Sequence, residues 1–208
     1  EDKGFRAARI RNLGAVSSKG NYLVFLDGDC IVFPDFISRH LNLAESGYMV
    51  MGSRILCSAA FTSRIENNKL WPCTFKFKEW LRSLAKNDIN RIFPLLKLPD
   101  GLWRKLRTKK WLGIRTFNLA VWKNDFYAVN GFDEQFEGWG HEDADLAIRL
   151  INNSILRKDG QFALPVLHLW HAENDRSNEK ENKNYLASSI NSRKIKAIKG
   201  IINSKVNK

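Results

Sequence analysis

An uninterrupted apolar run ends in two closely spaced aspartates early in the chain. Residues 21–26 are Asn-Tyr-Leu-Val-Phe-Leu, and Asp27-Gly28-Asp29 follow them directly. A run of this kind, bounded by Gly20 and by a turn-forming tripeptide, is typical of a strand buried on both faces. Ligand sites in open α/β sheets lie beyond the carboxyl ends of the strands, so we expect Asp27 and Asp29 to face such a site.

The segments that follow alternate between helix and strand. Pro34 stands at a helix start, apolar residues recur at helical spacing after it, and Gly47 ends the pattern. Residues 48–51 are again apolar and β-prone. A strand, a helix and a strand in this order predict an α/β fold with a central, mostly parallel sheet flanked by helices. Further along, the patterns predict strands at 117–121 and 161–170 and helices at 124–130 and 141–153.

The chain is long enough for one domain and is strongly basic. It has 208 residues, of which 44% are hydrophobic, a net charge of +12 and a pI near 9.8. Such a surface attracts polyanions, whether nucleic acid, anionic lipid or a phosphorylated substrate. The positive charge is concentrated in residues 104–110 and from Arg193 to Lys208, outside the carboxylate motifs.

Several classes of protein do not fit the sequence. No apolar run approaches the roughly 18 residues that a membrane-spanning helix needs. The three cysteines, Cys30, Cys57 and Cys73, include no Cys-x-x-Cys spacing, which argues against a disulfide framework or a structural zinc site. A reducing cytoplasm is the simplest setting.

Residues 69–115 have an unusual composition. Tryptophans alternate with lysines and arginines, and prolines interrupt the segment. We expect a helical and loop-like insertion here. Its composition suits a membrane interface and a nucleic-acid surface about equally, and an ordinary amphipathic helix pair would also account for it.

Residues 172–208 are expected to form an appendage to a domain that spans residues 1–171. Residues 172–191 are highly polar and predict a mobile loop. From Arg193 to Val206, isoleucines fall on one helical face with lysines around them, which predicts a basic amphipathic helix. Such a helix could lie on an anionic membrane or remain solvated.

The predicted helix at 141–153 carries acids on two of its faces. Asp143 shares a stripe with the apolar residues Leu146, Ala147, Leu150 and Ile151, so its side chain is expected to point inward. Asp145 and Arg149 lie four residues apart on the other side, where an exposed ion pair contributes only a few tenths of a kcal/mol.

The acids at the start of this helix have the properties of a catalytic base. The free N–H groups and the helix dipole favour ionised carboxylates at Glu142 and Asp143. An ionised, inward-facing carboxylate can remove a proton from an attacking hydroxyl. Acids are also common helix-starting residues, which explains Glu142 but not the inward position of Asp143.

Two groups of residues could bind a metal ion. The carboxylates of Asp27 and Asp29 are hard oxygen ligands that suit Mg²⁺ or Mn²⁺ bridging a diphosphate, although paired aspartates are also common in turns. His168 and His171 lie three residues apart, so in an extended strand their side chains face opposite ways. Both can reach one ion only if the chain turns there.

Together these segments resemble glycosyltransferase family 2 and the galactosyltransferase C-terminal region, with a nucleotide-diphospho-sugar transferase (GT-A) fold. The resemblance extends from about Gly4 to His171. It rests on residues 11–14, 19–29, 117–121, 130–134 and 138–146, and the last two segments are highly specific. Family members begin with a strand and helix that cradle the nucleotide base. We therefore expect a chain that lacks this first strand and helix, with uncertain activity in isolation.

The resemblance implies a metal-dependent, inverting glycosyltransferase with a nucleotide-diphospho-sugar donor and a glycan or lipid-linked acceptor. Asp143 would be the catalytic base, and Glu142, Trp139 and Gly140 would contact the acceptor. The donor contacts would be Arg11, Asn12, Asp27 and Asp29. Asp29, with His168 or His171, would hold Mn²⁺ or Mg²⁺.

Two other hypotheses remain open. A basic nucleic-acid-binding module would explain the pI and the tryptophan-rich basic segment but not the carboxylate motifs. An inactive sugar-binding fragment would explain a missing start. For the transferase, the placement of charge and aromatic residues favours the inner face of a bacterial membrane, where surface polysaccharide or lipopolysaccharide is assembled.

Overall fold

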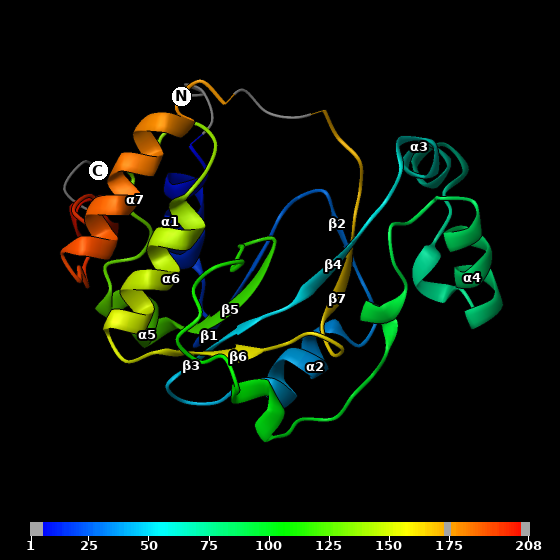
Figure 1. Cartoon of the computed structure of the whole chain (residues 1–208), viewed down its shortest axis with the longest axis horizontal. Helices are drawn as coiled ribbons and strands as arrows, with labels where there is room; N and C mark the ends of the chain where they lie inside the picture. The colour runs from blue at the N-terminus through cyan, green and yellow to red at the C-terminus, as the bar shows by residue number, and fades with distance from the viewer. Residues whose placement is uncertain (1–5, 173–175, 205–208) are drawn as a thin grey trace.

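Two mixed sheets form the centre of the protein (Figure 1). The computed structural model describes residues 6–172 and 176–204. The larger sheet contains, in spatial order, β1 (Tyr22–Leu26), β5 (Asn118–Trp122), β3 (Tyr48–Met51) and β6 (Leu156–Asp159). The smaller sheet contains β2 (Cys30–Val32), β7 (Pro165–His168) and β4 (Ser53–Leu56).

The strand directions confirm an α/β fold and correct one detail of it. Strand β5 pairs antiparallel with both β1 and β3, whereas β3 and β6 are parallel. Three strands of the larger sheet therefore share one direction and β5 opposes them, so the sheet is mixed. Strands β1 and β3, the first two strands predicted from the sequence, are not neighbours, because β5 lies between them. The local strand, helix and strand pattern could not show this insertion, since β5 comes from much later in the chain.

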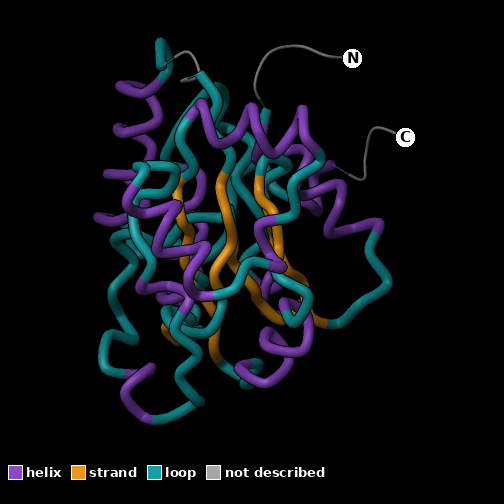
Figure 2. The backbone as a smooth tube through the Cα atoms, turned by 90° about the vertical axis from the view of Figure 1, so that its right-hand side faces the viewer, coloured by secondary structure: helices purple, strands orange, loops and turns teal. Residues whose placement is uncertain are grey.

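Side chains on the larger sheet alternate between two packed faces, as the pleat of a strand requires. On one face, Phe25 and Leu119 belong to a core shared with α1 (Ala7–Ser17), α5 (Lys123–Ala128) and α6 (Glu142–Asn152). On the other face, Val50 and Ala120 pack with Leu43 of α2 (Phe36–Leu43). Figure 2 shows the strands enclosed between these helical segments.

The smaller sheet carries its own core. Ile55 and Leu167 pack with residues of α3 (Ala59–Asn68) and α4 (Phe77–Ala85), among them Trp80. The two helices lie at the opposite end of the molecule from α6 (Figure 1). Beyond α4, the segment up to β5 consists of loops with two short 3₁₀ turns, η2 (Phe93–Leu95) and η3 (Leu102–Lys105), and η1 (Pro72–Thr74) precedes α4.

The C-terminal region differs from its prediction. Much of the expected polar loop is helix α7 (Glu179–Asn191), and in the described residues only α8 (Ile201–Ser204) is helical beyond it. The last residues of the predicted helix, 205–206, lie outside the described part. Ile201 is buried in the main core. Between the two helices, Asp133 accepts hydrogen bonds from the backbone N–H groups of Ile198 and Lys199 and pairs with Lys194. These contacts with the body of the protein replace a continuous amphipathic helix.

Helix α7 also overturns the prediction of an exposed pair at Asp145 and Arg149. Neither side chain is exposed, and Ser189 of α7 donates a hydrogen bond to Asp145. The second face of α6 is therefore buried under α7. The inward stripe is confirmed at Leu146, Ala147 and Leu150, all of which belong to the main core.

Candidate active site

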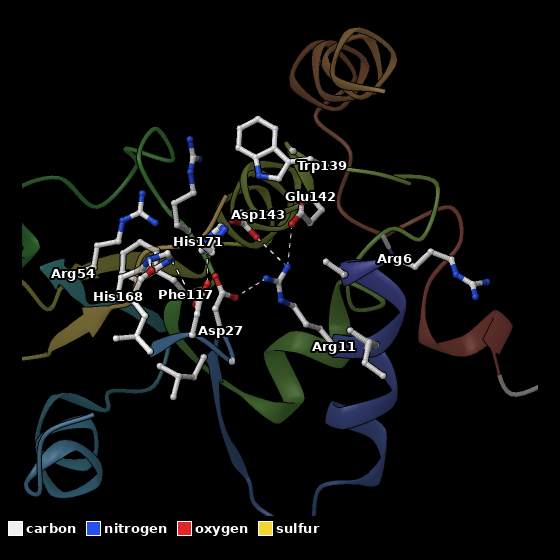
Figure 3. A pocket seen from close by; sticks show the side chains of 18 of the residues that line it. Arg6, Arg11, Asp27, Arg54, Phe117, Trp139, Glu142, Asp143, His168 and His171 are labelled. Carbon is white, nitrogen blue, oxygen red and sulfur yellow. Dashed lines mark hydrogen bonds and ion pairs between the residues drawn. The ribbon is translucent and has the colours of Figure 1, made fainter. Parts of the chain in front are cut away.

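Strand pairing brings the ends of four strands, β1, β5, β2 and β7, to one edge of the molecule. Leu26, the last residue of β1, pairs with Asn118, the first residue of β5. Cys30, the first residue of β2, pairs with His168, the last residue of β7. The aspartates that follow β1 thus lie beside residues that come from distant parts of the sequence. They line a cleft of about 1640 Å³ (Figure 3).

Asp29 and both histidines meet in this cleft. Nε2 of His171 lies 3.2 Å from Oδ2 of Asp29, and Nε2 of His168 lies 3.6 Å from Oδ1. Strand β7 ends at His168, and beyond its end the chain path brings both imidazoles to the same carboxylate. The backbone N–H of Leu169 donates to the carbonyl of Asp29 and fixes the two segments together.

The tautomers of both histidines leave Nε2 ready to bind a cation. Nδ1 of His168 lies 3.0 Å from the carbonyl oxygen of Leu169, and Nδ1 of His171 lies 2.7 Å from that of Ala172. Because a carbonyl oxygen only accepts, Nδ1 is the protonated nitrogen in each ring. In the neutral rings, two Nε2 lone pairs then face the carboxylate of Asp29. A cation between them would remove the repulsion, so the donor set fits a divalent metal ion.

Glu142 and Asp143 open α6 at the opposite side of the cleft. Oγ1 of Thr116, which precedes β5, donates to Oδ1 of Asp143 at 2.5 Å. Asp143 keeps a partly exposed side chain, whereas Glu142 is buried. Burial, with the neighbouring charge of Asp143, raises the pKa of Glu142 to about 7 against the opposing effect of Arg11.

The loop before α6 has an uncommon backbone. The φ angles are +73° at Gly138, +104° at Gly140 and +75° at His141. Glycine adopts such angles easily, but a residue with a Cβ is strained there, and the strain at His141 costs about 1–3 kcal/mol. The loop directs the first turn of α6 into the cleft.

Trp139 and Gly140, the predicted acceptor contacts, line the cleft. The guanidinium of Arg176 lies over the Trp139 ring, 4.4 Å from its centroid. Nδ2 of Asn182 in α7 donates to the carbonyl of Trp139 at 3.3 Å. Helix α7, which sequence patterns did not reveal, therefore supports this side of the cleft.

Arg11 lies in the cleft as expected, but the groups that pair with its guanidinium are carboxylates of the protein. One terminal nitrogen lies 2.8 Å from Asp27, and the other lies 3.0 Å from Glu142 and 3.5 Å from Asp143 (Figure 3). Burial tends to lower the pKa of Arg11, but the three carboxylates outweigh it and raise that pKa.

Asn12 does not belong to the described lining of the cleft. Its side chain is buried, donates to Phe132 O and Glu134, and accepts from the N–H of Phe132. We therefore replace the expected donor contact with a structural role: Asn12 ties α1 to the segment before α6. The sequence shows that Arg11 and Asn12 are neighbours in one helix, but it does not show which of the two side chains faces the cleft.

Two arginines that the sequence analysis missed also line the cleft, Arg54 of β4 and Arg115. The guanidinium of Arg54 lies 4.8 Å from the ring centroid of Phe117. Burial lowers the pKa of Arg54, and the charge of Arg115 lowers it further. Within the described residues, no carboxylate forms an ion pair with either arginine. Their position depends on strand pairing across the two sheets, so no local pattern marks them.

The architecture belongs to a known fold class, the nucleotide-diphospho-sugar transferase fold. A crystal structure of GalNAc-T7 with UDP, GalNAc and Mn²⁺ superimposes with a TM-score of 0.54 over 93% of this chain and 38% of that chain, at 13% sequence identity. At this identity the likeness shows the fold alone. It confirms the GT-A fold expected from the sequence.

The family follows from sequence comparisons. Residues 1–97 match the model of glycosyl transferase family 2, and residues 105–159 match the model described as the N-terminal domain of galactosyltransferase. Two validoxylamine A glucosyltransferases, from Streptomyces hygroscopicus subsp. jinggangensis (strain 5008) and subsp. limoneus, are each 30% identical over 156 residues, or 72% of this chain. The chain belongs to glycosyltransferase family 2, with a galactosyltransferase-like second half. It spans 36% and 34% of the lengths of these relatives.

Proposed function

We propose that this chain is the catalytic part of a metal-dependent, inverting glycosyltransferase. It would move a sugar from a nucleotide-diphospho-sugar donor to a hydroxyl group of a glycan or lipid-linked acceptor. One observation carries the proposal: the cluster of Asp29, His168 and His171 opens into the same cleft as Asp143. A cation-binding cluster and a carboxylate base are the two groups that such a transfer requires.

Asp29, His168 and His171 would hold the metal ion. Carboxylate oxygens suit both Mn²⁺ and Mg²⁺, but imidazole nitrogens bind transition ions better than Mg²⁺, which favours Mn²⁺. The bound ion would neutralise negative charge on the leaving diphosphate. Mn²⁺ is also the ion present in the GalNAc-T7 crystal structure.

Asp143 is the proposed base. Its carboxylate would accept the proton of the acceptor hydroxyl while the hydroxyl oxygen attacks the anomeric carbon. The bond from that carbon to the diphosphate oxygen breaks on the opposite face, so the configuration inverts. Thr116 donates its hydrogen bond to Oδ1 of Asp143, so Oδ2 would accept the proton of the acceptor hydroxyl. Glu142, Trp139 and Gly140 would contact the acceptor, with Trp139 as an apolar platform for a sugar ring.

The donor contacts need revision. Asp27, directly after β1, remains a proposed donor contact, which we place near the ribose, and Asp29 would contact the diphosphate through the metal ion. Arg11 is held by three carboxylates and Asn12 is buried, so we assign the diphosphate to Arg54 and Arg115 instead. Planar guanidinium groups bind phosphate oxygens in pairs, and neither of these two forms an ion pair with a carboxylate of the described residues.

Release of nucleoside diphosphate from a panel of nucleotide sugars, with and without Mn²⁺, tests the function. The panel includes a glucosyl donor, because the curated relatives are glucosyltransferases by name. We expect release with at least one donor, and its loss with a chelator. Steeply salt-dependent binding to oligonucleotides with no Mn²⁺-dependent release from any donor would favour the nucleic-acid hypothesis instead.

For the cellular setting we propose bacterial surface polysaccharide or lipopolysaccharide synthesis, with the protein on the cytoplasmic face of the membrane. In residues 6–172 and 176–204, no helix is long and apolar enough to span a bilayer. Contact would instead be peripheral, through exposed Trp71 and Phe77 and the basic side chains near them in sequence. Sedimentation with anionic vesicles at low salt, but not with neutral ones, is the expected result. Equal recovery in the supernatant of both would exclude this contact.

A further inference from the structure

Arg11 joins two sides of the cleft that come from distant parts of the chain. Asp27 follows β1, in the part of the chain that matches family 2. Glu142 and Asp143 begin α6, in the part that matches the galactosyltransferase model. The guanidinium of Arg11 lies between them, with one terminal nitrogen 2.8 Å from Asp27 and the other 3.0 Å from Glu142 (Figure 3).

The surroundings of Arg11 fix its side chain in this bridging position. Its guanidinium lies 5.7 Å from the ring centroid of Phe132. The next residue, Asn12, forms a pair of hydrogen bonds with the backbone of Phe132, which locks this turn of α1 against the segment before α6. The side chain is only 17% exposed. The Arg11 guanidinium, placed beside an aromatic ring and bonded at both terminal nitrogens, is therefore held in one position.

The chemistry of arginine suits this role better than a donor contact does. A guanidinium presents its donors in a rigid, planar fork, so its two terminal nitrogens can bind two separate carboxylates at a fixed spacing. A phosphate that approached Arg11 would meet three carboxylates already in contact with it. Lysine, with a compact ammonium group, carries the same charge but cannot span both sides in this way.

We propose that Arg11 is a positioning residue that holds the donor-side Asp27 and the acceptor-side Asp143 at a fixed separation. The inference rests on the proposed function for its catalytic meaning, since the separation matters because it aligns the anomeric carbon with the base. Arg11 touches neither the sugar nor the diphosphate in this role. Its loss would misalign the two substrates while both still bind.

The bridge itself is tested without any assay of activity. Arg11→Lys is compared with Arg39→Lys as a matched control. Arg39 lies on α2, outside the cleft, and its substitution also removes an arginine–carboxylate pair, the one with Asp35. We expect faster backbone hydrogen exchange in residues 26–30 and 138–143 of Arg11→Lys and unchanged exchange there in Arg39→Lys. Unchanged exchange in both segments of a folded Arg11→Lys protein would overturn the bridge.

A second variant covers the case in which Arg11→Lys does not fold. Asp27→Asn keeps the shape of the side chain and leaves Arg11 with Glu142 and Asp143, but it removes the charged anchor on the donor side. Exchange in residues 26–30 is expected to rise. Protection equal to that of the unaltered protein would again contradict a bridge.

Kinetics then separates positioning from donor binding. In Arg11→Lys we expect the affinity for UDP or GDP with Mn²⁺, whichever binds the unaltered chain, to stay within about twofold, whereas kcat falls about 10- to 100-fold, as misplacement of reacting groups does. A parallel fall in nucleotide affinity and in kcat would make Arg11 a donor contact and overturn the proposal. If the unaltered chain binds no nucleotide and transfers no sugar, the proposed function fails, while the exchange experiment still decides whether Arg11 is a bridge.

Discussion

Asp145 and Arg149 form an ion pair in which neither side chain is exposed to solvent. Nε and Nη2 of Arg149 lie 2.8 Å and 2.7 Å from Oδ2 of Asp145. Ser189 of α7 donates to the second oxygen of Asp145, and Nη1 of Arg149 donates to the carbonyls of Val129 and Gly131. The pair therefore connects α6 to α7 and to the segment on which the C-terminal residues dock.

Removing one member of this pair should destabilise the protein strongly. Arg149→Met leaves the carboxylate of Asp145 buried with only Ser189 as a side-chain partner, and an uncompensated buried charge costs about 3–5 kcal/mol. The free energy of unfolding, measured by urea titration at pH 7, is expected to fall by that amount.

Asp35 and Arg39 provide the matched comparison for this change. They have the same spacing of four residues and a similar distance of 2.7 Å, but their side chains are 35% and 21% exposed. Solvent screens such a pair, so Arg39→Met should cost no more than about 1 kcal/mol. Equal losses in the two variants would show that burial does not govern the energy of the α6 pair.

The same pair shows what sequence patterns could and could not predict. Apolar periodicity correctly placed the first three strands of the larger sheet and the inward stripe of α6. It could not predict burial on the second face of α6, because that face is covered by α7. The buried face of α7 consists of Asn182, Leu186 and Ser189, only one of which is apolar, so its sequence carries no hydrophobic periodicity.

The sequence identified most residues of the candidate site, but not the contacts between them. Asp27, Asp29, Asp143 and the two histidines were singled out from residue type and spacing, and the structure brings them to one cleft. The partners of Arg11 were not predictable, because they depend on how α1 packs beside α6. Arg54 and Arg115 were missed for the same reason, since each is an ordinary charged residue until the two sheets bring them together.

Substitution of Asp143 tests the proposed base separately from the proposed metal ligands. Asp143→Asn keeps the hydrogen bond from Thr116 but cannot accept the acceptor proton at the amide nitrogen, so transfer should fall by about 10²- to 10⁴-fold. The affinity for a nucleoside diphosphate with Mn²⁺, measured by calorimetry, should stay unchanged. Turnover at the unaltered rate would exclude Asp143 as the base.

Asp29→Ala should have the opposite profile. It removes the carboxylate that both histidines face, so the metal-dependent part of nucleotide binding is expected to weaken by at least about tenfold. Titration of Mn²⁺ into the variant and the unaltered chain measures this effect directly. If the two affinities for Mn²⁺ agree, Asp29 is not a ligand.

Docking of the C-terminal residues depends on Gly200. A Cβ at this position would overlap the backbone oxygen and side chain of Asn130, which cannot move because its amide bonds Ala197 and Ile202. Gly200→Ala should therefore destabilise the protein by about 1–3 kcal/mol, as overpacking does, with a lower melting temperature. At Gly14 of α1 a Cβ would meet no atom within 4 Å, so Gly14→Ala should instead stabilise by about 0.5–1 kcal/mol. A melting temperature of Gly200→Ala equal to that of the unaltered protein would contradict this packing.

The raised pKa of Glu142 predicts how stability depends on pH. Burial moves the pKa from 4.5 to about 7, so between these values the folded protein keeps a proton that the unfolded chain has lost. Rising pH then favours the unfolded state, and stability from this residue is lost between about pH 4.5 and pH 7, by up to roughly 3 kcal/mol. Glu142→Gln does not titrate. The free energy of unfolding in urea should therefore rise for the variant relative to the unaltered protein between pH 5 and pH 8. A difference between the two proteins that does not depend on pH would mean that Glu142 is ionised throughout.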